Sequence, residues 1–119
     1  MKIETSKLAG AALDWAVARC EGVIWAAPDG ELLGSASGMN YSTDWSQGGP
    51  IIERERICVA PMHGAGAGNL NDWIAQRRVD GKDVDSLFCE RGATALISAM
   101  RCYVASKLGD EVEIPEELL

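Results

Sequence analysis

Apolar side chains recur at helical spacing from Lys7 to Glu21, and this pattern predicts the first helix of the domain. We expect Thr5 or Ser6 to cap its start and Gly22 to end it in a left-handed conformation. The apolar arc covers more than half of the helix and leaves a narrow stripe for water, formed by Gly10, Asp14, Ala18 and Glu21. A helix of this kind is covered on most sides, by a sheet or by a second subunit.

The second predicted helix has the most regular pattern, with apolar residues at helical intervals from Leu96 to Leu108. Thr94 can cap its start, and Gly109 stops it. Short apolar or alternating runs bounded by turn residues predict strands at residues 23–27, 31–33, 56–60, 72–76 and 110–114. Two main helices packed on a short antiparallel sheet of about four or five strands make a small single α+β domain over residues 1–119.

Two longer segments, residues 62–69 and 77–85, are predicted to be loops, the first flexible and glycine-rich and the second charged. The glycines at positions 64, 66 and 68 have the spacing of a phosphate-binding loop but lack the Lys-Ser/Thr pair that follows it. His63 is the only histidine, and it stands beside this run, where its position is poorly held. We therefore expect no catalytic residues and no enzyme, with a hydrolase acting on a nucleotide as the minor alternative.

Composition narrows the classes of partner. The 119 residues are 47% hydrophobic and carry 18 acidic against 11 basic side chains, for a net charge of −7. This surplus argues against non-specific binding to nucleic acid, which depends on Lys and Arg. The longest apolar stretch, residues 22–28, is far shorter than the roughly 20 residues that span a bilayer, so we expect no membrane segment. The four cysteines lack zinc-site spacing; we interpret them as reduced and mostly buried, and expect no metal and no cofactor.

The densest group of unusual side chains lies between residues 41 and 56. The residues predicted to bind a ligand are Tyr41, Asp44, Trp45, Gln47, Arg54 and Arg56. The two aromatic rings can stack a planar ring, and the carboxylate and the amide can hydrogen-bond polar edges. Either arginine can hold a phosphate through paired hydrogen bonds. The block therefore contains the parts of a site for a nucleotide-like molecule.

The same block also has a purely structural interpretation. Trp45 can fill the core, Asp44 can cap a turn, and Glu53 can pair with Arg56 on the surface. Pro50 is expected to open a short helical turn through residues 51–55, because proline suits a first helical position. Two other tryptophans, Trp25 and Trp73, stand on predicted strands and are interpreted as core residues.

Three blocks of the sequence resemble the NinX family, small proteins encoded by tailed bacteriophages and prophages. The blocks are residues 8–18 (LAGAALDWAVA), 41–55 (YSTDWSQGGPIIERE) and 99–112 (AMRCYVASKLGDEV). Residues 23–40 and 58–90 resemble it less obviously, and Ala95 stands where the family pattern has proline. The resemblance implies a phage origin and an accessory role in the cytoplasm of the infected bacterium. It implies no reaction and no catalytic residues.

The leading hypothesis joins the central block to this origin. We expect a non-enzymatic binding protein that sequesters a small anionic nucleotide-like ligand, such as a signal made by a host anti-phage system. Because the first helix needs cover and a small chain has little depth for a pocket, we expect a homo-oligomer with any pocket near a subunit boundary.

The alternative hypothesis is an inhibitor or adaptor of a host protein that uses the acidic surface and has no small-molecule site. Residues 110–117 carry five carboxylates, which can imitate nucleic acid. The structural interpretation of this segment is a solvated edge strand, because Val112 and Ile114 alternate with the charges.

Overall fold

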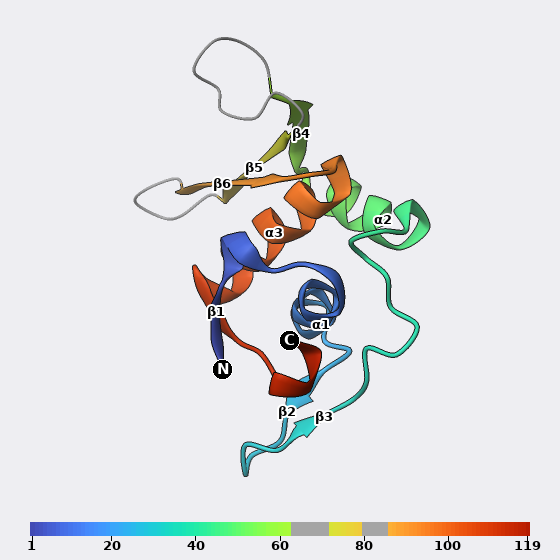
Figure 1. The fold of residues 1–119 in the computed structure, drawn as a ribbon, viewed down its shortest axis with the longest axis vertical. Helices are drawn as coiled ribbons and strands as arrows, with labels where there is room; N and C mark the ends of the chain where they lie inside the picture. Colours follow the sequence, from blue (N-terminus) through green and yellow to red (C-terminus); the bar gives the residue numbers. More distant parts are fainter. Residues whose placement is uncertain (63–71, 80–85) are drawn as a thin grey trace.

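The computed structural model describes residues 1–62, 72–79 and 86–119. Three α-helices lie within this part of the chain: α1 (Gly10–Cys20), α2 (Trp45–Glu55) and α3 (Ala95–Leu108). None of the described helices is long and apolar enough to cross a membrane. His63, the glycines at 64–68 and residues 80–85 of the predicted charged loop lie outside the described residues. Helix α3 lies between α1 and a three-stranded sheet (Figure 1), and this layering confirms the α+β class.

Helix α1 confirms the first predicted helix but begins at Gly10 rather than Lys7. The preceding residues Thr5–Lys7 form a short 3₁₀ helix, η1. The Thr5 hydroxyl does not cap α1; it donates a hydrogen bond of 2.6 Å to the Gly109 carbonyl and so ties η1 to the end of α3. Gly22 follows the helix with a φ of 78°, in the left-handed conformation that the sequence predicts.

The water-facing stripe predicted for α1 is wrong at Asp14 and Ala18, which are 8% and 0% exposed. The Val23 and Ile24 N–H groups donate to the Ala18 carbonyl, so the chain that leaves α1 folds back over this side. Near Asp14 the same side is covered by residues 34–43. The chain therefore covers its own first helix, and a second subunit is not required for that purpose.

Helix α2 begins five residues before the proline that was expected to open it. Asp44 caps the helix, since its Oδ1 accepts a hydrogen bond of 2.9 Å from the Ser46 N–H, which confirms the capping role weighed for this residue. Pro50 therefore lies inside α2, on its exposed side. The prediction placed the start too late because it read Pro50 as a first helical residue.

Helix α2 packs closely on the core at Gly48. A Cβ atom added there would lie 2.4 Å from the Tyr41 carbonyl oxygen and 2.6 Å from Leu96 Cδ1. These distances are shorter than any ordinary contact, so the helix can approach α3 and residue 41 only because this position has no side chain.

Seven strands among the described residues form three small antiparallel sheets. Strand β1 (Lys2–Glu4) pairs with β7 (Glu111–Glu113), β2 (Trp25–Ala26) pairs with β3 (Leu32–Leu33), and β4 (Cys58–Pro61) and β6 (Ser86–Gly92) flank β5 (Trp73–Val79). The sequence predicted five of these regions and missed β1 and β6. It also predicted a loop from Arg77, where β5 continues to Val79.

The missed strands give little local signal in the sequence. Strand β1 has a single apolar side chain, that of Ile3. In β6, Leu87 is 63% exposed while Glu90 is half-buried, so hydrophobicity does not mark the buried face. Pairing with β7 and with β5 holds these strands, and such long-range partners cannot be read from local sequence.

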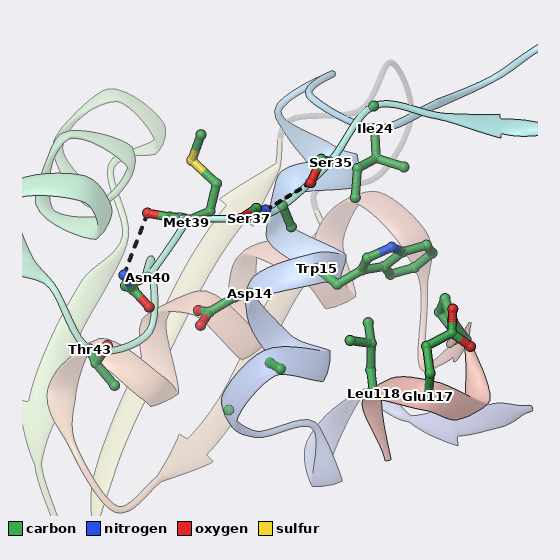
Figure 2. Close-up of a pocket in the computed structure, with 16 residues that line it drawn as sticks. Asp14, Trp15, Ile24, Ser35, Ser37, Met39, Asn40, Thr43, Glu117 and Leu118 are labelled. Atoms are coloured by element: carbon green, nitrogen blue, oxygen red, sulfur yellow. Dashed lines mark hydrogen bonds between the residues drawn. The ribbon is translucent and has the colours of Figure 1, made fainter.

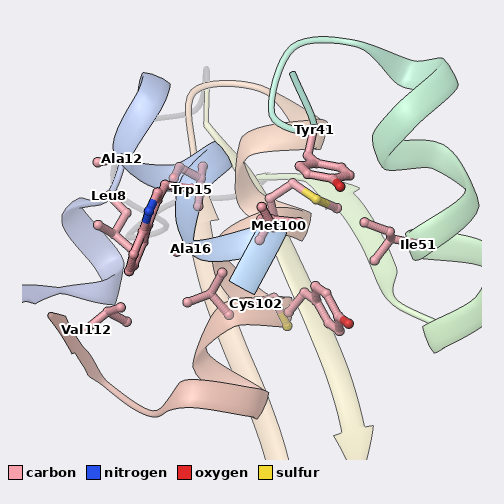
Figure 3. Close-up of a cluster of buried hydrophobic side chains, with 14 of the residues drawn as sticks. Leu8, Ala12, Trp15, Ala16, Tyr41, Ile51, Met100, Cys102 and Val112 are labelled. Atoms are coloured by element: carbon pink, nitrogen blue, oxygen red, sulfur yellow. The ribbon is translucent and has the colours of Figure 1, made fainter. Parts of the chain in front are cut away.

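The core lies between α1 and α3, and Met100 lies there beside Tyr41 and Ile51 (Figure 3). Trp25 does not join it, contrary to the prediction, because β2 belongs to a short hairpin that leaves this side chain 53% exposed. Trp73 is half-buried. The residues with no exposed surface include Leu13, Ala16, Val17, Met100, Val104 and Ile114.

The cysteines are less buried than predicted. Cys102 is buried and Cys20 is half-buried, and burial raises the pKa of both thiols to about 12. Cys58 and Cys89 are exposed. Both are direct cross-strand neighbours of Gln76, one on each side, on the sheet face turned away from α3.

Candidate functional site

A cavity of about 650 Å³ lies between α1, residues 34–43 and the C-terminal 3₁₀ helix η2 (Glu116–Leu118). Figure 2 shows the Trp15 indole between Ile24 and Leu118 at one side of this cavity. Its polar lining consists of Asp14, Ser35, Ser37, Asn40, Thr43 and Glu117. The volume lies within the range of about 300–1,000 Å³ that is usual for small-molecule sites.

Asp14 is the most confined charge in this cavity. It is 8% exposed, and its Oδ1 accepts a hydrogen bond of 2.9 Å from the Ser42 N–H. Among the described residues no group donates to its Oδ2. Glu117 is the other charged residue in the described lining, which includes no Lys or Arg. The cavity therefore favours hydrogen-bond donors and positive charge over anions.

Gln47 and Asp44 lie behind one wall of the cavity and hold it in place. The Gln47 Oε1 accepts a hydrogen bond of 2.7 Å from the Asn40 N–H, and its Nε2 donates to the Gly38 carbonyl at 3.4 Å and to Asp44 Oδ2 at 3.3 Å. Hydrogen bonds from the Ser46 hydroxyl and N–H lower the pKa of Asp44. Both residues therefore have a positioning role in this structure, because neither lines the cavity.

The two aromatic residues of the predicted site lie apart. Tyr41 is 8% exposed and packs in the core, where burial first and then the charges of Glu21 and Asp14 raise its pKa. Trp45 is 58% exposed, so it does not fill the core. It lines a separate groove of about 450 Å³ with Trp73 and the first residues of α3. The structure does not bring the two rings to one pocket.

Arg54 belongs to a network that joins the ends of α1 and α2 to α3. Its Nη1 and Nη2 donate to the two carboxylate oxygens of Glu21 at 3.0 and 2.6 Å, and the Tyr103 hydroxyl donates to Glu21 Oε2 at 2.7 Å. Burial raises the pKa of Glu21, but the hydrogen bonds from Arg54 and Tyr103 outweigh it and the net shift is downward. Arg54 is thus already paired with a carboxylate.

A second arginine completes this network from the sheet side. Arg77 of β5 donates from Nη2 to Glu55 Oε2 at 3.1 Å and from Nη1 to the Ser106 hydroxyl at 2.5 Å. The guanidinium carbons of Arg54 and Arg77 lie 5.9 and 5.8 Å from the Tyr103 ring centre. The arrangement fixes four elements relative to one another, while the buried Arg77 Nε has no hydrogen-bond partner among the described residues.

Arg56, the last predicted ligand residue, ends α2 in a left-handed conformation with a φ of 56° and is exposed. It does not line the cavity. The six predicted residues therefore divide between the core, the cavity wall, the groove at Trp45, the α1–α2 junction and the exposed end of α2.

Sequence reasoning missed the residues that do line the cavity, above all Asp14 and Trp15. Asp14 was assigned to a wet stripe, although it is the single acid in an otherwise apolar run from Leu8 to Ala18. The position of this one acid among apolar residues was the sequence signal that could have identified Asp14 as a site residue. Residues 34–40 are rich in Ser and Gly, a composition that is typical of a loop, and they form the opposite side of the cavity.

The fold and the cavity define a small α+β domain with a ligand-sized hollow beside its first helix. A family model described as "Bacteriophage P22, NinX" matches residues 4–107, and the chain therefore belongs to the NinX family. The match includes residues 23–40 and 58–90, where the resemblance was less obvious, and so includes the loop that lines the cavity. A search of the curated proteins finds no match.

Proposed function

We propose that this phage protein is a non-enzymatic binding protein that acts in the cytoplasm of the infected bacterium and sequesters a small nucleotide-derived molecule, such as a host anti-phage signal. The observation that carries the proposal is the cavity of about 650 Å³ between α1 and residues 34–43, with an aromatic residue and several hydrogen-bonding groups in its lining. Membership of a phage family supports a role during infection.

Binding without chemistry is proposed because the described lining supplies no activated nucleophile. The Ser35 hydroxyl accepts a hydrogen bond of 3.1 Å from the Ser37 N–H within its own loop. Among the described lining residues there is no His, Lys or Cys to serve beside a serine. A slow conversion of a nucleotide to product over hours would contradict this part of the proposal.

Calorimetry with a panel of nucleosides, mononucleotides, ADP-ribose and cyclic dinucleotides tests the proposal. We expect heat from at least one compound, and we expect the cavity-filling Ala11→Trp variant to lose it, because Ala11 is an exposed position that lines the cavity. Trp45→Ala is the matched control, since it removes a large exposed side chain outside the cavity.

Two results would overturn the cavity as the site. One is the absence of heat with every compound of the panel. The other is binding that survives Ala11→Trp and disappears in Trp45→Ala, which would place the ligand in the groove at Trp45 and Trp73, where Trp45 is the one residue of the site predicted from the sequence. Thermal unfolding of each variant shows whether it is folded.

A second candidate function is an inhibitor or adaptor of a host protein. It is favoured by the β2–β3 hairpin, where Trp25 is 53% and Leu32 is 42% exposed, since exposed Trp and Leu side chains are typical of contact surfaces. A host protein captured by the intact chain and lost with Trp25→Ser and Leu32→Ser would support it. Unchanged capture by these variants would count against it.

A further inference from the structure

We infer that the ligand of this cavity presents adjacent N–H donors to Asp14, as an amino-substituted nucleobase does, and that it places no phosphate within the cavity. The inference rests on the proposed function and names the chemical class of its ligand. It departs from the anionic ligand that the sequence led us to expect.

Asp14 has little access to solvent. Asp14 follows the fully buried Leu13 on α1, and the residue as a whole is 8% exposed. A carboxylate removed from water is costly to hold unless hydrogen bonds replace the lost solvent. The Ser42 N–H supplies one such bond, to Oδ1.

The Asp14 carboxylate can accept more hydrogen bonds than the one from Ser42. Two carboxylate oxygens offer about four acceptor sites. After the Ser42 bond, Oδ1 has a further lone pair and Oδ2 receives no hydrogen bond from the described residues. Because Asp14 also lines the cavity, the donors that complete its shell can come from a bound molecule. A ring N–H beside an exocyclic amino group has the spacing to serve both oxygens at once.

The charge of the cavity lining disfavours phosphate. Asp14 and Glu117 are the charged residues of the described lining, and both are acidic. The two arginines expected to hold phosphate are elsewhere: Arg54 binds Glu21, and Arg56 lies at the end of α2. A phosphate inside the cavity would be repelled, whereas the neutral base of a nucleoside, or a cationic ring, would be attracted.

The Trp15 ring favours a ligand that has a flat apolar surface. Its side chain is 7% exposed and lines the cavity next to Asp14 in sequence, and Figure 2 shows its ring on the Ile24 and Leu118 side. The cavity thus offers an aromatic residue on one side and a carboxylate on another. Planar heterocycles with N–H donors match both features.

The test compares guanosine with inosine, which lacks the exocyclic amino group, and with guanosine 5′-monophosphate, by calorimetry on the wild-type chain. We expect guanosine to bind at least tenfold more tightly than inosine, because one hydrogen bond to a charged acceptor is lost. We expect the monophosphate to bind no more tightly than guanosine. These comparisons need no variant, so they do not depend on the folding of a mutant.

Asp14→Asn is the decisive variant, because it keeps an oxygen for the Ser42 N–H and removes the negative charge. We expect guanosine affinity to fall about tenfold or more and the difference between guanosine and inosine to shrink. Glu53→Gln, which removes an exposed carboxylate outside the cavity, is the control and is expected to change guanosine affinity less than threefold.

The outcomes separate this inference from the proposed function. If compounds of the panel bind but guanosine and inosine bind equally, or Asp14→Asn leaves affinity unchanged, the donor inference is overturned and the proposed function stands. If phosphate-bearing compounds bind and the nucleosides do not, the donor inference is again overturned. If nothing binds, the proposed function fails, and the inference fails with it.

Discussion

At the scale of single residues, position in the fold decides what each side chain can do. Asp44 and Gln47 have the chemistry of ligand contacts, yet the structure engages them with Ser46, Asn40 and Gly38. Asp14, read as a solvated acid, is 8% exposed and lines the cavity of about 650 Å³. Residue type predicted which groups are able to bind a ligand, but long-range packing selected the ones that are placed to do so.

Gly48 gives the sharpest prediction at this scale. Gly48→Ala places a methyl group against the Tyr41 carbonyl and Leu96, and we expect it to destabilise the protein by about 1–3 kcal/mol. Gly49→Ala is the matched control in the next helical position, where the nearest atom, Trp45 Cε3, would lie 3.7 Å from the new Cβ. There the gain in helix propensity should leave stability equal or higher by up to about 1 kcal/mol. Equal melting temperatures for Gly48→Ala and wild type would contradict the close packing of α2.

At the scale of elements, capping residues and apolar periodicity predicted helices and strands correctly where the signal lies within the element's own sequence. Thr94 caps α3, which ends before Gly109, and the edge strand predicted at residues 110–114 is β7. The start of α2 was missed because Asp44 competes with Pro50 as a start signal, and the Asp44 side chain decides the outcome. The cavity wall was beyond prediction, since it depends on the hydrogen bonds that Gln47 donates to the Gly38 carbonyl and accepts from the Asn40 N–H.

The junction of α1, α2 and α3 should make stability depend on pH. The Glu21 pKa is lowered below its ordinary value of 4.5 in the folded state. The contribution of Glu21 to the free energy of unfolding is therefore fully present above about pH 4.5, and it is lost as the pH falls through the lower pKa of the folded state. We expect Glu21→Gln to lower the free energy of unfolding at pH 7 by about 1–2 kcal/mol, a range kept small because Arg54 is half exposed. The deficit should shrink towards pH 3, as measured by urea unfolding at both pH values.

Glu53→Gln is the control for this junction, because Glu53 is an exposed acid on the same helix as Arg54. Its unfolding free energy should follow that of the wild type at both pH values. A Glu21→Gln deficit that is the same at pH 7 and pH 3 would show that the network with Arg54 and Tyr103 does not depend on the charge of Glu21.

At the scale of the whole molecule, the three small sheets and three α-helices of the described residues make a domain whose first helix is covered by its own chain. The structure also shows where the unevenly distributed acidic residues lie. Five of the carboxylates lie in residues 110–117, and Glu117 among them contributes to the cavity. The acidic surplus therefore reaches the candidate site itself, which favours donors over phosphate there.

The homo-oligomer stays a prediction at this scale. The α1 surface that first supported it is buried within the chain, while Trp25, Leu32 and Leu87 remain exposed and can form a contact between copies. Light scattering at micromolar concentration is expected to give a multiple of the 12.7 kDa chain mass. A mass of 12.7 kDa itself would contradict the prediction and would make the cavity a site within one chain.

Amide chemical-shift mapping of the ¹⁵N-labelled protein during titration with guanosine shows directly whether the cavity beside Asp14 binds the ligand. We predict that the shifted amides cluster around the cavity, in residues 10–15, 34–43 and 116–118. Shifts that cluster instead at Trp45, Trp73 and residues 93–97, or no shifts at saturating guanosine, would contradict the assignment of the cavity beside Asp14 as the binding site.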